Sequence, residues 1–144
     1  MYDRILLPTD GSDTARLAAE HAIDMADRHD AVLHVLYVAE RTRDDPGQKG
    51  LEEKVAEELN DGRDVVESIE NRAAEYGLDT EAVVEPGVPR TMIEEYAAEH
   101  DIGLIVIGST GASDVAEKLL GTVAKYVVNE APADVFVVRS DAEV

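Results

Sequence analysis

Two short segments of this sequence carry the residues most able to bind a charged ligand. One is Pro8-Thr9-Asp10, after an apolar run at residues 5–7, and the other is residues 108–111, after an apolar run at 103–107. The second segment begins and ends with glycine, and nine residues after it stands the pair Gly121-Thr122. Glycine lets a backbone approach a ligand closely, and consecutive N–H groups in a turn can converge on an anion. These residues predict a phosphate-binding edge across from the Asp10 carboxylate.

Hydrophobic periodicity predicts the elements that must position these segments. Strands that alternate with helices predict a single α/β domain over residues 1–144, with a parallel sheet covered by helices on both faces. Ligands bind such sheets beyond the carboxyl ends of the strands, where the strand order reverses. Glycine, proline and charged residues at 39–50 predict a mobile loop. The expected strands are 5–7, 31–38, 80–85, 103–107 and 134–138, and the expected helices are 15–25 with its N-cap at Ser12, 51–76 with a candidate kink at Gly62 and a cap at Gly77, 88–100 and 116–129.

Charge and composition exclude several classes of function. The chain has 144 residues, with 13 Lys and Arg against 32 Asp and Glu, and a formal net charge of −19. Such a chain repels phosphate backbones, so we expect no nucleic-acid partner. It has no cysteine, which excludes thiolate metal centres and disulfides. No apolar run approaches the roughly 20 residues of a membrane span, so we expect no membrane partner and a cytoplasmic location.

The acidity also predicts a salt-rich environment. Like charges in a compact state repel one another, and molar salt reduces the Debye length to about 3 Å. We therefore expect a halophilic protein whose stability falls when salt is removed.

The glycine pattern resembles a known nucleotide-binding signature. Gly108-x-x-Gly111, nine residues and then Gly121-Thr122 is similar to the signature of the universal stress protein family, and residues 5–12 and 131–138 resemble the first and last strands of that family. The resemblance implies an open five-stranded sheet in the order 3-2-1-4-5, a Rossmann-like, adenine nucleotide alpha hydrolase-like fold. It also implies membership of the ATP-binding subfamily and a homodimer joined through residues 134–138.

The resemblance further implies a set of ligand contacts. ATP, or ADP or AMP, would be the ligand, with Mg²⁺ bound through the phosphates and no protein ligand assigned to the metal. The position after Gly108-Ser109 often carries His or Arg in similar proteins but is Thr110 here, so a cation near the phosphates is not expected. The implied contacts are Pro8, Thr9 and Asp10 for adenosine, the Val35 backbone for the adenine edge, Ile107 and Gly108 for ribose, and Gly111, Gly121, Thr122 and Val123 for the phosphates.

Other nucleotide-binding folds fit the sequence less well. The chain has neither the Rossmann Gly-x-Gly-x-x-Gly nor the P-loop Gly-x4-Gly-Lys-Ser/Thr. A flavodoxin would stack aromatic rings on its flavin, but there is no Trp and Phe136 is the single Phe. A phospho-acceptor regulator would need an Asp after the third strand and a Lys after the fifth, where Glu85 and Arg139 stand.

The sequence assigns no catalytic residue. His34 lies in a strand expected to be buried, where a histidine is more often a core group than a catalyst. Slow ATP hydrolysis through water and Mg²⁺ stays open. Two functions are left: an ATP-binding stress-response regulator that acts as a homodimer, and a nucleotide-free dimeric interaction protein of the same fold.

Overall fold

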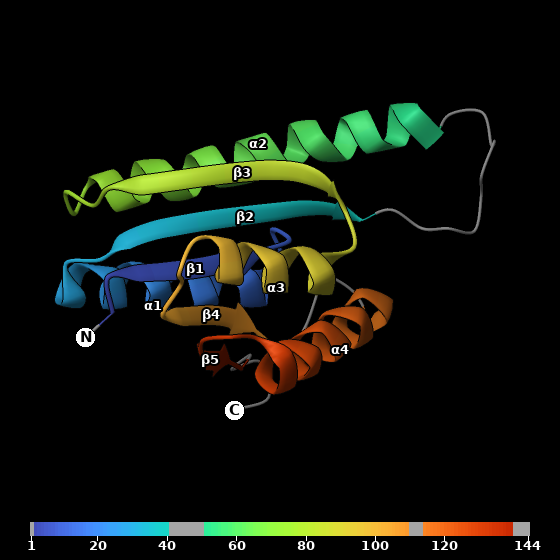
Figure 1. The fold of residues 1–144 in the computed structure, drawn as a ribbon. Helices are drawn as coiled ribbons and strands as arrows, with labels where there is room; N and C mark the ends of the chain where they lie inside the picture. Colours follow the sequence, from blue (N-terminus) through green and yellow to red (C-terminus); the bar gives the residue numbers. More distant parts are fainter. Residues whose placement is uncertain (1, 41–50, 110–113, 140–144) are drawn as a thin grey trace.

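Strands and helices alternate along the chain and build one parallel sheet. The computed structural model describes residues 2–40, 51–109 and 114–139. The strand order is β3-β2-β1-β4-β5 (Figure 1), which confirms the predicted α/β fold and strand order. The elements are β1 (Arg4–Thr9), α1 (Asp13–His29), β2 (Val32–Glu40), α2 (Leu51–Ala74), β3 (Thr80–Gly87), α3 (Pro89–Glu99), β4 (Leu104–Gly108), α4 (Asp114–Glu130) and β5 (Asp134–Val138).

The sheet buries side chains on both of its faces. Along β1, Ile5 and Leu7 join the core formed with α1 and α2, whereas Leu6 between them joins the core formed with α3 and α4. This alternation is the period of two of a β-strand. Figure 1 shows α3 and α4 in front of the sheet and α1 behind it. The central strands are therefore near-continuous apolar runs because each face is covered by helices.

Helix ends follow the predicted caps. The Ser12 Oγ accepts a hydrogen bond from the Ala15 N–H at 3.1 Å, which confirms the predicted N-cap of α1. After α2, Gly77 has a φ of +73°, and the Leu78 N–H donates to the Ala73 carbonyl at 3.2 Å. This is the bonding of a Schellman cap, in which glycine takes the left-handed position.

Three predicted boundaries are wrong because prolines lie where this sheet tolerates them. β1 continues through Pro8 to Thr9, since the described pairing of β1 with β4 reaches only Leu6. β3 continues through Pro86 because it is an edge strand, where a missing N–H costs little. Its extension pairs with β2, so Ala39 and Glu40 belong to β2 and not to the predicted loop at 39–50. The rest of that loop, residues 41–50, lies outside the described residues.

Gly62 serves close packing, since α2 runs as one helix through this position. Gly62 is buried against the ring of Tyr37, and a Cβ at this position would overlap that ring. The glycine lets α2 approach β2 closely, which places the charged residues of α2 near the carboxyl end of the sheet.

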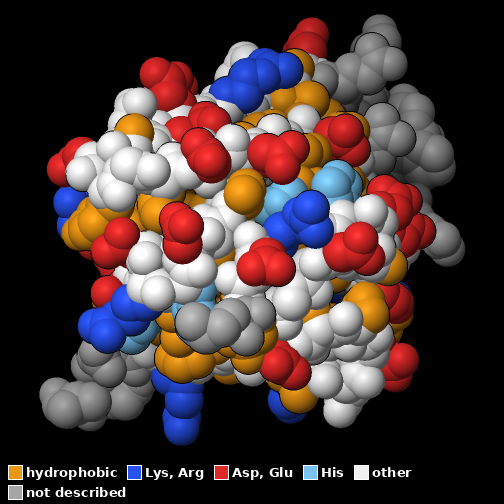
Figure 2. Space-filling view, turned by 60° about the vertical axis from the view of Figure 1, so that its left-hand side comes forward, with side chains coloured by type: hydrophobic (Ala, Val, Ile, Leu, Met, Phe, Trp, Pro, Cys, Tyr) orange, Lys and Arg blue, Asp and Glu red, His pale blue; other side chains and the backbone are white. Residues whose placement is uncertain are grey.

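The acidic residues are spread over the surface. Figure 2 shows Asp and Glu side chains scattered over one face, with fewer Lys and Arg side chains between them. Within the described part of the chain, no helix has the length and apolar character that a membrane crossing requires.

Candidate functional site

A cavity of about 320 Å³ lies at the carboxyl ends of β1 and β2. β1 pairs with β2 along Arg4–Thr9, but with β4 only through Ile5 and Leu6. β1 and β4 therefore separate before their carboxyl ends, and a crevice opens where the strand order reverses. Its volume is in the range of small-molecule sites, about 300–1,000 Å³. The described residues that line it are Pro8, Thr9, Asp10, Leu36, Tyr37, Val38, Glu40, Glu58, Val88, Pro89, Arg90, Ile93, Thr122 and Val123.

The turn after β1 is fixed by its own side chains. The Gly11 N–H donates to Thr9 Oγ1 at 3.2 Å, and the Ser12 N–H donates to Asp10 Oδ1 at 2.9 Å. Gly11 has a φ of +78°, and a Cβ there would come within 3.0 Å of Val65 in α2. Asp10 is thus both a turn residue and a wall of the cavity, and its carboxylate is held in place before any ligand arrives.

The side of the cavity formed by β2 and α2 is acidic. Burial raises the pKa of the Tyr37 hydroxyl, and the nearby carboxylates of Glu58, Asp10 and Asp61 raise it further. Burial also raises the pKa of Glu58, with Glu40 and Asp61 adding to the shift. Carboxylates grouped in this way can accept hydrogen bonds from hydroxyl and amino groups, such as those of a nucleoside.

The opposite side, formed by α3 and α4, carries Arg90. Its guanidinium carbon lies 5.6 Å from the centroid of the Tyr126 ring, within the range of a cation–π contact. The Tyr126 hydroxyl donates to Glu94 Oε1 at 3.0 Å, and this hydrogen bond is the main reason that the pKa of Tyr126 is raised. Arg90 is the one Lys or Arg among the described residues that line the cavity.

A buried histidine lies between β2 and α3, outside the described lining of this cavity. His34 Nδ1 is 2.7 Å from the Tyr96 hydroxyl oxygen, whereas His34 Nε2 has no hydrogen-bond partner among the described residues and lies 3.6 Å from Glu81 Oε2. Burial lowers the pKa of His34, against an opposing effect of Glu81, and His100 and Arg4 lower it further. Burial raises the pKa of Tyr96 to about 12. The expectation that His34 is a buried core group is met, with one ring nitrogen satisfied.

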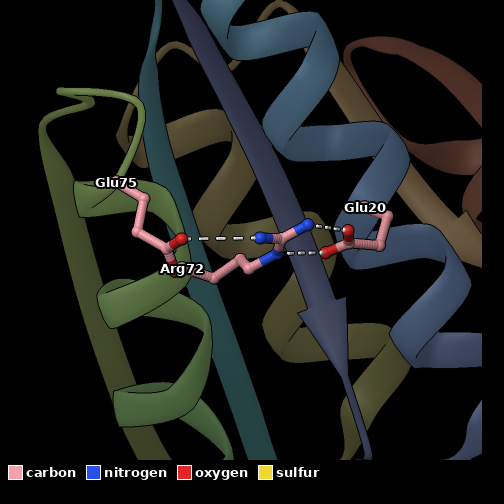
Figure 3. Close-up of polar contacts among 3 residues, drawn as sticks. All are labelled: Glu20, Arg72 and Glu75. Atoms are coloured by element: carbon pink, nitrogen blue, oxygen red, sulfur yellow. Dashed lines mark hydrogen bonds and ion pairs between the residues drawn. The ribbon is translucent and has the colours of Figure 1, made fainter.

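A larger hollow of about 1000 Å³ lies between α1 and α2. Arg72 spans it: its Nη2 is 2.8 Å from Glu20 Oε1, and its Nε is 3.2 Å from Glu20 Oε2. Its Nη1 is 3.6 Å from Glu75 Oε1, and Figure 3 shows the guanidinium between the two carboxylates. The hydrogen bond from Arg72 lowers the pKa of Glu20. Arg72 is therefore neutralised within the protein, whereas Arg16, which also lines this hollow, takes part in none of the described ion pairs.

The strand order agrees with comparisons to known proteins. The chain matches the Universal stress protein family over residues 1–139. It belongs to the universal stress protein family. Universal stress protein MJ0531 from Methanocaldococcus jannaschii is 34% identical to it over 144 residues, covering 96% of this chain and 83% of that protein.

Solved structures of universal stress proteins share the fold. UspA from Lactobacillus plantarum has a TM-score of 0.82 and 32% identity, covering 96% of this chain and 98% of that one. A universal stress protein in complex with cAMP has a TM-score of 0.72 and 26% identity, covering 95% and 97%. A family member from Arabidopsis thaliana with AMP bound has a TM-score of 0.70 and 17% identity, covering 97% and 93%, and shows the fold alone.

In this universal stress protein, half of the predicted contacts come together in the cavity. They are Pro8, Thr9 and Asp10 from β1 and the turn after it, and Thr122 and Val123 from α4. These segments are more than a hundred residues apart in the sequence. The sheet joins them because β1 and β4 are neighbours and α4 follows β4.

The other predicted contacts are not among the described residues that line the cavity. The side chains of Val35 and Ile107 are fully buried, one in each core. Gly108 ends β4, where a Cβ would come within 3.0 Å of Thr14 Cγ2 and 3.3 Å of the Thr14 backbone. Gly121 faces the Ser109 carbonyl oxygen, 3.3 Å from where its Cβ would be. Gly111 and Thr110 lie outside the described residues.

Sequence reasoning missed Arg90 as well as the lining residues of β2, α2 and α3. The resemblance led us to consider a cation near the phosphates only at position 110, whereas Arg90 comes from the first turn of α3. A signal was present, since Gly87-Val88-Pro89-Arg90 follows directly on a predicted strand, at the carboxyl edge of the sheet. Within the described ranges, no cluster of three His, Cys, Asp or Glu side chains could hold a metal ion.

Proposed function

We propose that this universal stress protein binds an adenine nucleotide in the cavity at the ends of β1 and β2, as a regulatory protein of the stress response. The candidate ligands are ATP, ADP and AMP. The observation that carries the proposal is the meeting of Pro8-Thr9-Asp10 with Thr122 and Val123 around one cavity of about 320 Å³. Family members with bound cAMP and AMP support it.

The cavity has the chemistry that such a ligand needs. Its acidic side offers acceptors for the donors of ribose and adenine, and its other side offers a hydroxyl at Thr122 and a cation at Arg90. If Mg²⁺ accompanies the phosphates, its charge would offset part of the repulsion from a chain with a net charge of −19. The residues present therefore fit a nucleotide, and the proposed role is binding without a catalytic residue.

The first test asks which small molecule accompanies the protein. We expect an adenine nucleotide to be released when protein purified in molar KCl is heat-denatured, and mass spectrometry of the supernatant identifies it. Added MgATP, ADP or AMP should raise the unfolding midpoint, since a ligand at about 100 times its Kd stabilises by about 2.7 kcal/mol. If no nucleotide is released and none stabilises the protein, the proposal fails and the nucleotide-free interaction protein stands instead.

A substitution tests the position of the site. In Gly121→Leu the new side chain would press on the Ser109 carbonyl, 3.3 Å from the Cβ position. We expect nucleotide stabilisation to be lost while the far-UV circular dichroism spectrum stays unchanged. Asn129→Leu, at an exposed position of the same helix, is the matched control and should bind normally. Unchanged binding by Gly121→Leu would show that the nucleotide lies elsewhere.

We also propose that the protein forms a homodimer through β5. This strand is an edge of the sheet, and Phe136 and Val137 are each 37% exposed on it. An uncovered apolar edge strand invites pairing with another chain. Light scattering in molar KCl should give the mass of two chains, and Phe136→Glu should give the mass of one. A wild-type protein with the mass of one chain would refute the dimer and leave the nucleotide proposal unaffected.

A further inference from the structure

The cavity described above has two electrically different ends. Asp10, Glu40 and Glu58 line one part of it, and the charges that act on Tyr37 and Glu58 are all carboxylates of this group and of Asp61. Arg90 acts instead on Tyr126, at the seam between α3 and α4. The carboxylates of the described lining thus lie toward α2, and its one cation, Arg90, lies toward α4, where Glu94 and Glu130 also act on Tyr126.

Arg90 lies beside the residue predicted to hold phosphate. Thr122 and Tyr126 are four residues apart in α4, so their side chains share one face of the helix. The guanidinium lies over the Tyr126 ring and also lines the cavity with Thr122. The Thr122 hydroxyl and the Arg90 cation thus stand on the same side of the cavity.

Arg90 has no carboxylate partner in the part of the chain that the structure describes. The ion pairs found there join Arg28, His34 and Arg72 to acidic residues, and Arg90 takes part in none of them. Glu94, one turn further along α3, accepts the Tyr126 hydroxyl hydrogen bond. Arg90 is therefore the one cation on the described wall of this cavity, and none of the described ion pairs takes up its charge.

We propose that Arg90 binds the phosphate of the nucleotide, held for that purpose over the ring of Tyr126. This inference rests on the proposed nucleotide-binding function. A guanidinium presents its N–H groups in a fork that matches two phosphate oxygens, and the aromatic ring below limits the positions the fork can take. The nucleoside then lies toward Tyr37 and the carboxylates, and the anionic group lies toward α4.

The test compares AMP with adenosine, which lacks the phosphate. Isothermal titration calorimetry gives the Kd of each for the wild-type protein and for Arg90→Gln, in one KCl concentration at which both are folded. We expect Arg90→Gln to weaken AMP binding at least tenfold, equivalent to about 1.4 kcal/mol, and to leave adenosine binding within about twofold. The Kd of Arg90→Lys for AMP should lie between those of wild type and Arg90→Gln, because lysine keeps the charge but lacks the planar guanidinium. Arg28→Gln, which removes a distant exposed arginine, is the control for net charge and should change neither Kd.

The outcomes separate this inference from the function on which it rests. A wild-type protein that binds neither adenosine nor AMP overturns both. If the wild-type protein binds AMP and Arg90→Gln binds it equally well, the nucleotide site stands and the role of Arg90 is refuted. Equal weakening of AMP and adenosine by Arg90→Gln also refutes a phosphate contact, because it shows a general change in the cavity. Thermal unfolding of each variant verifies that it is folded.

Discussion

The two hollows of this protein treat an arginine in opposite ways. Between α1 and α2, Arg72 makes a two-pronged contact with Glu20 and a longer one with Glu75. In the cavity at the ends of β1 and β2, Arg90 lies over the Tyr126 ring, and no described carboxylate pairs with it. The first hollow is larger, at about 1000 Å³ against about 320 Å³, and it is lined by Arg72, which is neutralised, and by Arg16, which takes part in none of the described ion pairs. Volume alone therefore does not identify a binding site: Arg72 joins α1 and α2 through its contact with Glu20, whereas Arg90 is the one cation on the described wall of the smaller cavity.

Salt removal should have the largest effect, and it tests the charge balance behind this comparison. Low salt strengthens the Arg72–Glu20 pair but also the repulsion among Asp10, Glu40 and Glu58, because the Debye length grows from about 3 Å at 1 M to about 10 Å at 0.1 M. Repulsion should win at a net charge of −19. We expect the thermal midpoint to fall by more than about 6 °C, or roughly 2–3 kcal/mol, between these KCl concentrations. An unchanged midpoint by circular dichroism would contradict the prediction that the protein is halophilic.

The next largest effect is expected from Gly62→Leu, at a position of α2 that packs against a wall of the cavity. The new side chain would overlap the Tyr37 ring, and overpacking a filled site costs about 1–3 kcal/mol. Because Tyr37 lines the cavity, nucleotide affinity should fall together with the unfolding free energy measured by denaturant titration. Ala56→Leu, at an exposed position of the same helix, should change neither quantity. Normal stability of Gly62→Leu would mean that α2 can move away from β2.

A pH titration tests the buried His34, which contacts Tyr96 of α3. The pKa of His34 is lowered in the folded state, so below the ordinary value of about 6.5 the unfolded chain binds more protons than the folded one. The contribution of His34 to the free energy of unfolding is therefore complete above that value. It is lost as the pH falls, by at most about 1.4 kcal/mol per pH unit. We expect the unfolding free energy of wild type to drop more steeply from about pH 7 to about pH 5 than that of His34→Asn.

His21→Asn is the control for this titration, since His21 is exposed. Its slope should match that of wild type. Equal slopes for wild type and His34→Asn would show that protonation of His34 costs the fold nothing, with Glu81 at 3.6 Å compensating for burial.

The smallest effect is expected from Arg72→Gln, the counterpart of Arg90→Gln in the other hollow. The ion pair is exposed, with relative exposures of 44% for Arg72 and 54% for Glu20, so its loss should lower the unfolding free energy only slightly. AMP affinity should not change. If Arg72→Gln weakened AMP binding as much as Arg90→Gln, the distinction between the two hollows would be wrong.

The sequence was sufficient to predict the architecture because the relevant signals are local. Near-continuous apolar runs, Ser12 before a helix and Gly77 after one are local signals, and the strands and caps that they predict are confirmed. Strand ends at Pro8 and Pro86 were misjudged because whether a proline is tolerated depends on which neighbouring strand is absent at that point. That information lies in the sheet, not in the local sequence.

The candidate site also combines residues that local sequence identifies with residues that only the packing brings in. The segments around Asp10 and Thr122 were identifiable because they follow strands whose carboxyl ends meet at one edge. Arg90 and Glu58 were not, since they reach the cavity through the packing of α3 and α2. Gly108 illustrates a residue with two explanations: its spacing fits a nucleotide signature, and its contact with Thr14 also requires a small residue.

The early parting of β1 and β4 has a mechanical consequence. Two residue pairs join these strands, whereas six join β1 to β2, so the centre of the sheet is its weakest backbone seam. A molecule that contacts Asp10 on one side and Thr122 on the other would link the two halves of the sheet across this short pairing. Ligand binding would then slow local opening of the half of the sheet that contains β4 and β5. A partner protein could detect this change without contacting the ligand.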